Sequence, residues 1–250
     1  LVVSGVLTIY GFSGVSILVL AALIAVIYAA AYGYTLEKIA YRPLRNSPRL
    51  AALISAIGMS LFLQNYVLLA QTADYLPFPE LVPQFDFMEP VAHIMGSAEL
   101  IILITSAITM IGLTVLIKYT RIGKAMRATQ QDMVMARLTG INVDRVISVT
   151  FIIGSVLAAI AGVLVGSYIG QINYFIGFMA GVKAFTAAVL GGIGNIPGAA
   201  LGGLVLGLAE AMAAGYISSA YEDVFAFGVL VLILILRPSG LLGKAVKQKV

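Results

Sequence analysis

The chain has 250 residues, 61% of them hydrophobic and only 10% charged, with a mean hydropathy of +1.04 and a formal net charge of +4. This composition excludes a soluble enzyme and a disordered tail, and the absence of cysteine together with the single histidine, His93, argues against thiol catalysis, disulfides and metal sites. The positive charge indicates membrane topology and not a nucleic-acid partner, because the basic residues lie between long apolar runs, as in a polytopic helical membrane protein.

The first apolar stretch, Leu1–Tyr10, is shorter than the roughly 20 residues that a membrane-spanning helix needs. It begins without methionine and without the basic region of a signal peptide, so we expect a chain cut inside a transmembrane helix, with N-terminal span(s) missing. After the break at Gly11–Gly14, further apolar runs predict membrane helices: Val15–Leu36, Leu50–Thr72, Leu100–Ile117, Val146–Gly170, Val182–Tyr216 and Val224–Leu236. The predicted fold is all-α, a single transmembrane helical bundle over residues 1–250.

The connections between these runs divide by charge. All lysine and arginine residues except Lys183 fall in three segments: Lys38, Arg42, Arg45 and Arg49; Lys118, Arg121, Lys124, Arg127, Arg137 and Arg145; and Arg237, Lys244, Lys247 and Lys249. The other connections carry acids: Asp74, Glu80, Asp86, Glu89, Glu99, Glu222 and Asp223. By the positive-inside rule, the basic segments and the C-terminus are predicted to be cytoplasmic.

Counting membrane crossings gives the run 182–216 an unusual path. The helix Val146–Gly170 leaves the cytoplasm and the helix Val224–Leu236 must return to it, so the run between them enters and leaves from the outer side. Its middle, Gly191–Gly198, holds glycines and a proline that a continuous helix does not tolerate. We therefore expect a broken helical hairpin over 182–216, re-entrant or thinly spanning, with its tip near the cytoplasmic half.

The hairpin tip is the candidate translocation path or gate, through Gly191, Gly192, Gly194, Asn195, Pro197 and Gly198. Its glycines either pack helices closely or free backbone groups that a zwitterionic substrate meets as it passes, and both interpretations stay open. Glycines repeated at a spacing of four, such as Gly198 with Gly202 and Gly203 with Gly207, indicate close helix packing.

Four polar residues lie inside the predicted membrane runs: Gln64, Asn65, Lys183 and Glu210. If the hairpin folds at its tip, Lys183 and Glu210 both return toward the outer surface and can pair. A structural pair is favoured over a gating or substrate role, since a carboxylate in the membrane costs about 2.5–3.5 kcal/mol. Gln64 and Asn65 are expected to make interhelical hydrogen bonds more than to bind substrate. The methionines are interpreted as core filler, and His93 with its acidic loop as an outer surface or docking rim.

The predicted cytoplasmic segment 119–145 carries a helix with one small face, made by Ala125, Ala128, Ala136 and Gly140. Gly140 suits the C-cap of this helix, while Asp132 and Arg137 are expected to face solvent or a partner. A short helix held off the membrane can dock into a groove of another protein. A solvated linker that only sets topology explains the same spacing, so both interpretations stay open.

Several motifs together resemble the ABC importer permeases of the branched-chain amino acid class, and most closely their LivH-type subunit. They are Ala40-Tyr41-Arg42-Pro43-Leu44-Arg45, the run Ile54–Tyr66, the pattern Arg127-Ala128 with Asp132, Ala136 and Gly140-Ile141, and the run Lys183–Ala199. The likeness covers essentially the whole chain, except at the front, where family members carry a further span or two.

The resemblance implies that segment 119–145 is a coupling loop that meets ATPases through Gly123, Lys124, Arg127, Ala128, Asp132, Ala136 and Gly140. It implies a half-pore in the bacterial inner membrane with these partners: a second, LivM-type permease subunit, two cytoplasmic ATPase subunits and a periplasmic protein that binds leucine, isoleucine or valine. No Gly-x-x-x-x-Gly-Lys-Ser/Thr loop occurs in the sequence, so ATP hydrolysis is expected on partner chains, with no cofactor in this one. The alternatives are a permease for urea, short amides or other amino acids, and an ion-coupled secondary carrier, for which only Glu210 offers an intramembrane carboxylate.

Overall fold

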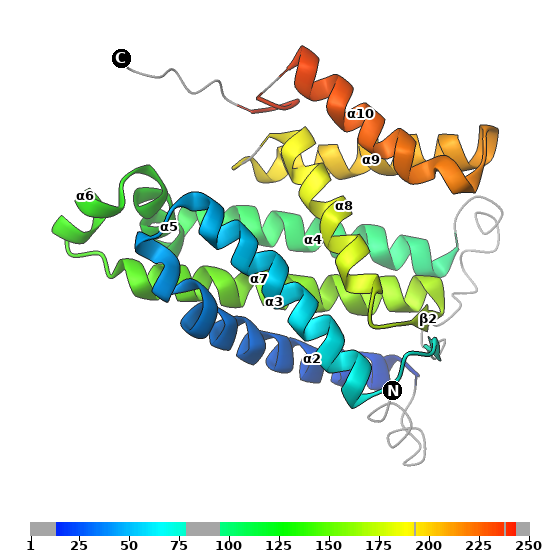
Figure 1. The fold of residues 1–250 in the computed structure, drawn as a ribbon, viewed down its shortest axis with the longest axis horizontal. Helices are drawn as coiled ribbons and strands as arrows, with labels where there is room; N and C mark the ends of the chain where they lie inside the picture. The colour runs from blue at the N-terminus through cyan, green and yellow to red at the C-terminus, as the bar shows by residue number, and fades with distance from the viewer. Residues whose placement is uncertain (1–13, 79–95, 193, 238, 244–250) are drawn as a thin grey trace. The chain divides into compact units, whose positions relative to one another are not determined.

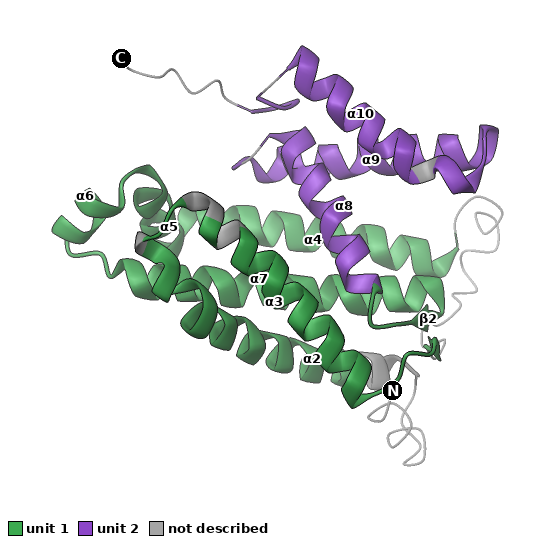
Figure 2. Cartoon of the chain, in the orientation of Figure 1, with its two compact units in different colours: residues 1–175 green, residues 176–250 purple. Residues whose placement is uncertain are grey.

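The computed structural model describes residues 14–78, 96–192, 194–237 and 239–243. Helices occupy the predicted apolar runs (Figure 1), with the bounds α2 Gly14–Leu36, α3 Arg49–Ala70, α4 Ser97–Tyr119, α7 Val143–Ile169, α8 Ile176–Gly191, α9 Ile196–Tyr216 and α10 Glu222–Leu236. The predicted all-α class is therefore confirmed. By its contacts the chain divides into two compact units, residues 1–175 and 176–250 (Figure 2).

Within the described residues, four helical stretches are long and apolar enough to cross a membrane: Val19–Tyr41, Ser97–Tyr119, Val143–Ile169 and Ile196–Tyr216. Shorter apolar helical stretches cover Ile54–Ala70, Ile176–Gly191 and Asp223–Leu236. Large apolar side chains lie exposed along these helices, for example Ile27 at 69% and Leu69 at 87% exposure. Water would penalise such surfaces, whereas lipid tails solvate them.

In the first unit, α2 and α7 pack along each other (Figure 1). Gly33 permits their close approach, because a Cβ at this position would overlap the side chain of Ser155. Beyond the end of α2, the rings of Tyr41 and Phe151 are in contact, with centroids 4.9 Å apart. The two helices thus form one tightly packed pair.

Shorter elements join the long helices of this unit: the π-helix η1 Glu37–Tyr41, the 3-10 helix η2 Pro43–Asn46, the helices α5 Arg121–Gln131 and α6 Met133–Leu138, and the strands β1 Leu76–Pro77 and β2 Gln171–Ile172. The two strands pair antiparallel, with Leu76 opposite Ile172 and Pro77 opposite Gln171. This pairing ties the segment after α3 to the end of α7.

In the second unit, α8 packs on α9, α9 packs on α10, and the 3-10 helix η4 Ser219–Tyr221 connects the last two. The helical break falls between Gly191 and Ile196, inside the predicted hairpin tip. However, α8 begins at Ile176 and not at Val182, because the apolar residues Ile176, Phe178 and Met179 extend the helix toward the N-terminus. The side of the membrane from which the hairpin enters stays a prediction.

Candidate functional site

The predicted coupling segment folds as two short helices, α5 and α6, between α4 and α7. Thr120 caps α5, because its Oγ1 accepts a hydrogen bond from the N–H of Gly123 at 3.0 Å. Asp132 caps α6, with its Oδ1 accepting from the N–H groups of Val134 and Met135 at 2.8 and 3.0 Å. Since such caps satisfy donors that a helix start leaves open, these two residues fix where each helix begins.

The end of α6 has the glycine cap expected at Gly140, where φ is +84°. The N–H of Gly140 donates to the carbonyl of Arg137 at 3.0 Å, and the N–H of Ile141 donates to that of Ala136 at 3.0 Å. These two bonds form a Schellman motif, whose left-handed residue is most often glycine. A sharp, defined turn therefore separates α6 from α7.

The expected continuous helix with one small face is wrong. Extended backbone at Asp132 (φ −156°, ψ 112°) ends α5, so the small residues are divided between two helices and a turn: Ala125, Ala128, Ala136 and Gly140. Asp132 is exposed, as expected, and its carboxylate also caps α6. Local capping thus outweighs helix continuation at this position.

The remaining predicted coupling residues differ in exposure. Gly123 is buried where α5 turns back on α4, and a Cβ there would overlap the backbone carbonyl of Ile117. Lys124 and Arg127 are exposed, and Arg127 donates to the carbonyl of Lys118 at 3.3 Å. Gly123 therefore shapes the turn, while the two cations lie where a partner can contact them.

The exposed surface of α6 is mostly apolar, with Arg137 as the charged residue of this helix, a feature that the sequence reasoning missed. Its large side chains are mostly exposed: Met133 at 53%, Val134 at 66%, Met135 at 60% and Leu138 at 76%. We refer to these four residues as the α6 apolar face. Core filling is therefore wrong for these two methionines, because Ala136, at 3% exposure, takes the inward position. Exposed apolar side chains beside charged residues are typical of a docking surface.

Close backbone contacts hold α8 and α9 together at the broken tip. A Cβ on Gly191 would overlap the carbonyl group of Gly198, and a Cβ on Gly198 would overlap that of Gly191. The turn between the helices has positive φ at Gly192 (+105°) and Gly194 (+90°), which glycine adopts at little cost. These contacts favour close packing as the role of the tip glycines, and a part in the translocation path stays a prediction.

The chain after α10 binds this same tip. The N–H groups of Leu241 and Leu242 donate to the last carbonyl groups of α8 at 2.8 and 3.1 Å, and the Asn195 Nδ2 donates to the carbonyl of Leu242 at 3.0 Å. Asn195 also caps α9, where Pro197 sits in the first turn and its missing N–H removes no helical bond. The carbonyl groups of Leu190 and Gly191 and the side chain of Asn195 thus have hydrogen-bond partners within the second unit.

Three charged residues meet in the second unit: Lys183, Glu210 and Asp223. The Lys183 Nζ lies 3.1 Å from the Glu210 Oε1 and 3.0 Å from the Asp223 Oδ1. The expected pair of Lys183 with Glu210 is present, and Asp223, assigned from sequence to an outer connection, joins it from the first turn of α10. One ammonium group therefore bridges two carboxylates in a partly buried site.

We expect Lys183→Met to lower the free energy of unfolding by about 1–3 kcal/mol, because it leaves two carboxylates facing each other without a cation. Glu210→Gln should cost less, since Lys183 keeps Asp223 as its partner. Thermal unfolding of the detergent-purified protein measures both losses. Equal losses of stability in the two variants would contradict a structural role. So would a Glu210→Gln variant that assembles normally but transports a different amino acid.

Within the described residues, Gln64 and Asn65 do not make the interhelical hydrogen bonds expected of them. The Asn65 Nδ2 donates to the carbonyl of Leu61 at 2.8 Å, in its own helix. The Gln64 Nε2 is buried and has no hydrogen-bond partner among these residues. Gln64 therefore carries an unmet donor, and a role in binding substrate stays a prediction.

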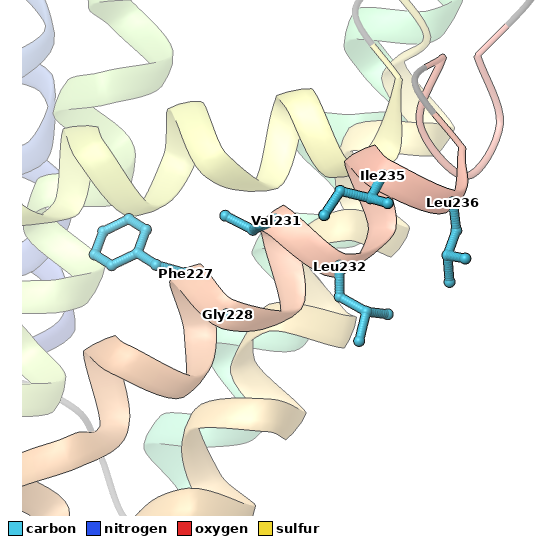
Figure 3. A pocket seen from close by; sticks show the side chains of 6 residues that line it. All are labelled: Phe227, Gly228, Val231, Leu232, Ile235 and Leu236. Carbon is cyan, nitrogen blue, oxygen red and sulfur yellow. The ribbon is translucent and has the colours of Figure 1, made fainter.

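An apolar groove of about 630 Å³ runs along α10 (Figure 3), lined by Phe227, Gly228, Val231, Leu232, Ile235 and Leu236. Because all six lining residues are apolar, the groove suits a lipid chain or an apolar helix and does not suit a zwitterion. The predictions for His93 and its acidic neighbours Glu80, Asp86 and Glu89 lie outside the described residues.

The long apolar helices define an α-helical, multi-pass membrane protein, with the short helices α5 and α6 set between α4 and α7. Over residues 1–234 the chain matches the family described as "Branched-chain amino acid transport system / permease component". The chain belongs to this family of transport components, which confirms the resemblance seen in the motifs and does not favour a secondary carrier.

The chain is similar to two permease proteins over most of its length. It is 51% identical over 232 residues to the high-affinity branched-chain amino acid transport system permease protein LivH of Escherichia coli K12, covering 90% of this chain and 74% of that protein. It is 48% identical over 248 residues to the corresponding permease protein BraD of Pseudomonas aeruginosa, covering 98% and 81%. No solved structure matches the chain.

Proposed function

We propose that the chain is a permease subunit of an ATP-driven importer for leucine, isoleucine and valine, and that it forms half of the translocation pathway in the bacterial inner membrane. The observation that carries the proposal is the identity of 48–51% to permeases of that substrate class. The long apolar helices, which require lipid around them, support it.

The proposed partners are a second, LivM-type permease subunit, two cytoplasmic ATPase subunits and a periplasmic amino-acid-binding protein. ATP is hydrolysed on the ATPase subunits, and this chain holds no cofactor of its own. The α6 apolar face, flanked by the exposed cations Lys124 and Arg127, supports a docking surface for one ATPase. Docking there requires a cytoplasmic α5–α6 segment and C-terminus, as the distribution of basic residues predicts.

The test is uptake by the complete transporter, with both permeases, the ATPases and the binding protein, in proteoliposomes. Uptake of labelled leucine should require ATP and the binding protein and should persist when ionophores collapse ion gradients. An ATPase variant that binds but does not hydrolyse ATP is the matched control and should abolish uptake. Full uptake without the ATPases, or uptake that follows an ion gradient, would overturn the proposal.

A further inference from the structure

A buried carboxylate outside the coupling segment and the hairpin organises a small ion network. Glu37, in η1, is only 1% exposed. Its carboxylate accepts a hydrogen bond from the Ser148 Oγ at 2.7 Å and pairs with the guanidinium of Arg45. Arg45 pairs in turn with Asp144, in the first turn of α7. We refer to Glu37, Arg45, Asp144 and Ser148 as the clasp.

The clasp joins two segments that are far apart in the sequence, since Arg45 and Asp144 are separated by 99 positions. Arg45, at 16% side-chain exposure, uses one terminal nitrogen for each carboxylate, which the planar fork of a guanidinium allows. Because a buried carboxylate is stable only when it is paired, Glu37 fixes Arg45, and Arg45 fixes the start of α7. The π-helical turn that carries Glu37 is a rare conformation that often marks a functional position.

The clasp meets the C-terminal end of the coupling segment 119–145, because Asp144 belongs to both. Gly140 forms the turn that follows α6. Asn142 caps α7, because its Oδ1 accepts a hydrogen bond from the N–H of Arg145 at 3.0 Å. Ala136 and Val143, on either side of this turn, are 3% and 2% exposed, and both α5 and α6 pack against α7. A displacement of α6 therefore reaches the first turn of α7 through packed, capped backbone.

We propose that the clasp transmits a displacement of α6 to the α2–α7 pair, with Arg45 as its central positioning residue; this inference rests on the proposed function. Tightly packed helices move as units, so tying η1 to the start of α7 makes both helices follow α6 together. When the tie is loosened, the start of α7 shifts alone and ATP is hydrolysed without a matching movement of the pathway.

The test compares two neighbouring arginines that both contact Asp144. The Arg42 Nη2 lies 3.5 Å from the Asp144 Oδ2 and its side chain is 51% exposed, whereas Arg45 is largely buried between two carboxylates. In the complete transporter, Arg45→Lys should raise the ATP hydrolysed per leucine imported by about 2- to 30-fold, because an ammonium group does not hold both carboxylates in one plane. Arg42→Lys should leave this ratio unchanged.

An unchanged ratio in Arg45→Lys beside a coupled wild type overturns the clasp, even if the variant melts at a lower temperature, because a purely structural role moves only the melting temperature. Absence of ATP-dependent uptake in the wild type instead overturns the proposed function. If Arg45→Lys does not assemble, Ser148→Ala decides by the same ratio, since it removes one hydrogen bond from Glu37 and no charge.

Discussion

Replacing Gly202 with alanine should destabilise the second unit, whereas the same replacement at the adjacent Gly203 should not. A Cβ on Gly202 would overlap the carbonyl of Ala187 and would lie 2.8 Å from the backbone nitrogen of Gly191. Backbone atoms cannot rotate away as a side chain can, so α8 and α9 must move apart. We expect a loss of about 1–3 kcal/mol, measured by thermal unfolding of the purified protein and by the yield of extracted protein.

Gly203 is the matched control because it lies in the same helix and its new Cβ would meet only the Ala187 side chain, at 3.8 Å. Alanine is favoured over glycine inside a helix by about 1 kcal/mol, so Gly203→Ala should be neutral or slightly stabilising. Similar losses at both positions would contradict the steric argument. They would show that the loss arises from something common to both positions and not from the backbone that faces Gly202.

The two glycines also show how far the sequence predicts packing. Gly198 with Gly202 and Gly203 with Gly207 have the same spacing, and each pair indicates close helix contact. Only the first pair meets neighbouring backbone; Gly207 has open space where its Cβ would lie. Spacing places residues on one face of a helix, but which face meets α8 depends on side chains elsewhere in the second unit.

The long apolar helices could be predicted because lipid demands about 20 apolar residues in a row, a signal that is local and strong. The glycine cap at Gly140 and the pair of Lys183 with Glu210 were also accessible, the first from turn chemistry and the second from the cost of lone charges in a membrane. Each of these inferences rests on a free-energy cost that can be read from the residue types alone.

The break at Asp132 and the clasp were not accessible in the same way. The residues around Asp132 favour a helix that continues through this position. The helix is interrupted there because the Asp132 carboxylate caps the start of α6. Glu37 and Ser148 are separated by 111 positions, so nothing local indicates that they meet. Arg42 and Arg45 look alike as topology signals, and only burial distinguishes the second.

Replacing Leu138 with aspartate should disrupt the contact between the α6 apolar face and an ATPase subunit. Leu138 is 76% exposed, so the change should alter the stability of the chain itself by no more than about 0.5 kcal/mol. A carboxylate buried against an apolar groove costs about 2 kcal/mol or more, which corresponds to roughly 30-fold weaker binding. Titration of the purified ATPase onto the detergent-solubilised permease measures the affinity, and ATP-dependent leucine uptake should fall with it.

Two further variants separate docking from a general effect of charge. Leu138→Met keeps an apolar side chain of similar volume and should retain near-normal affinity. Ile169→Asp places a charge at another exposed position, where the side chain is 48% exposed. Ile169 lies at the far end of the 27-residue helix α7, about 40 Å from its start, so this variant should still bind the ATPase. Wild-type affinity in Leu138→Asp would mean that α5 and α6 form only a topological linker, because an apolar docking face does not accommodate a buried carboxylate without loss of binding.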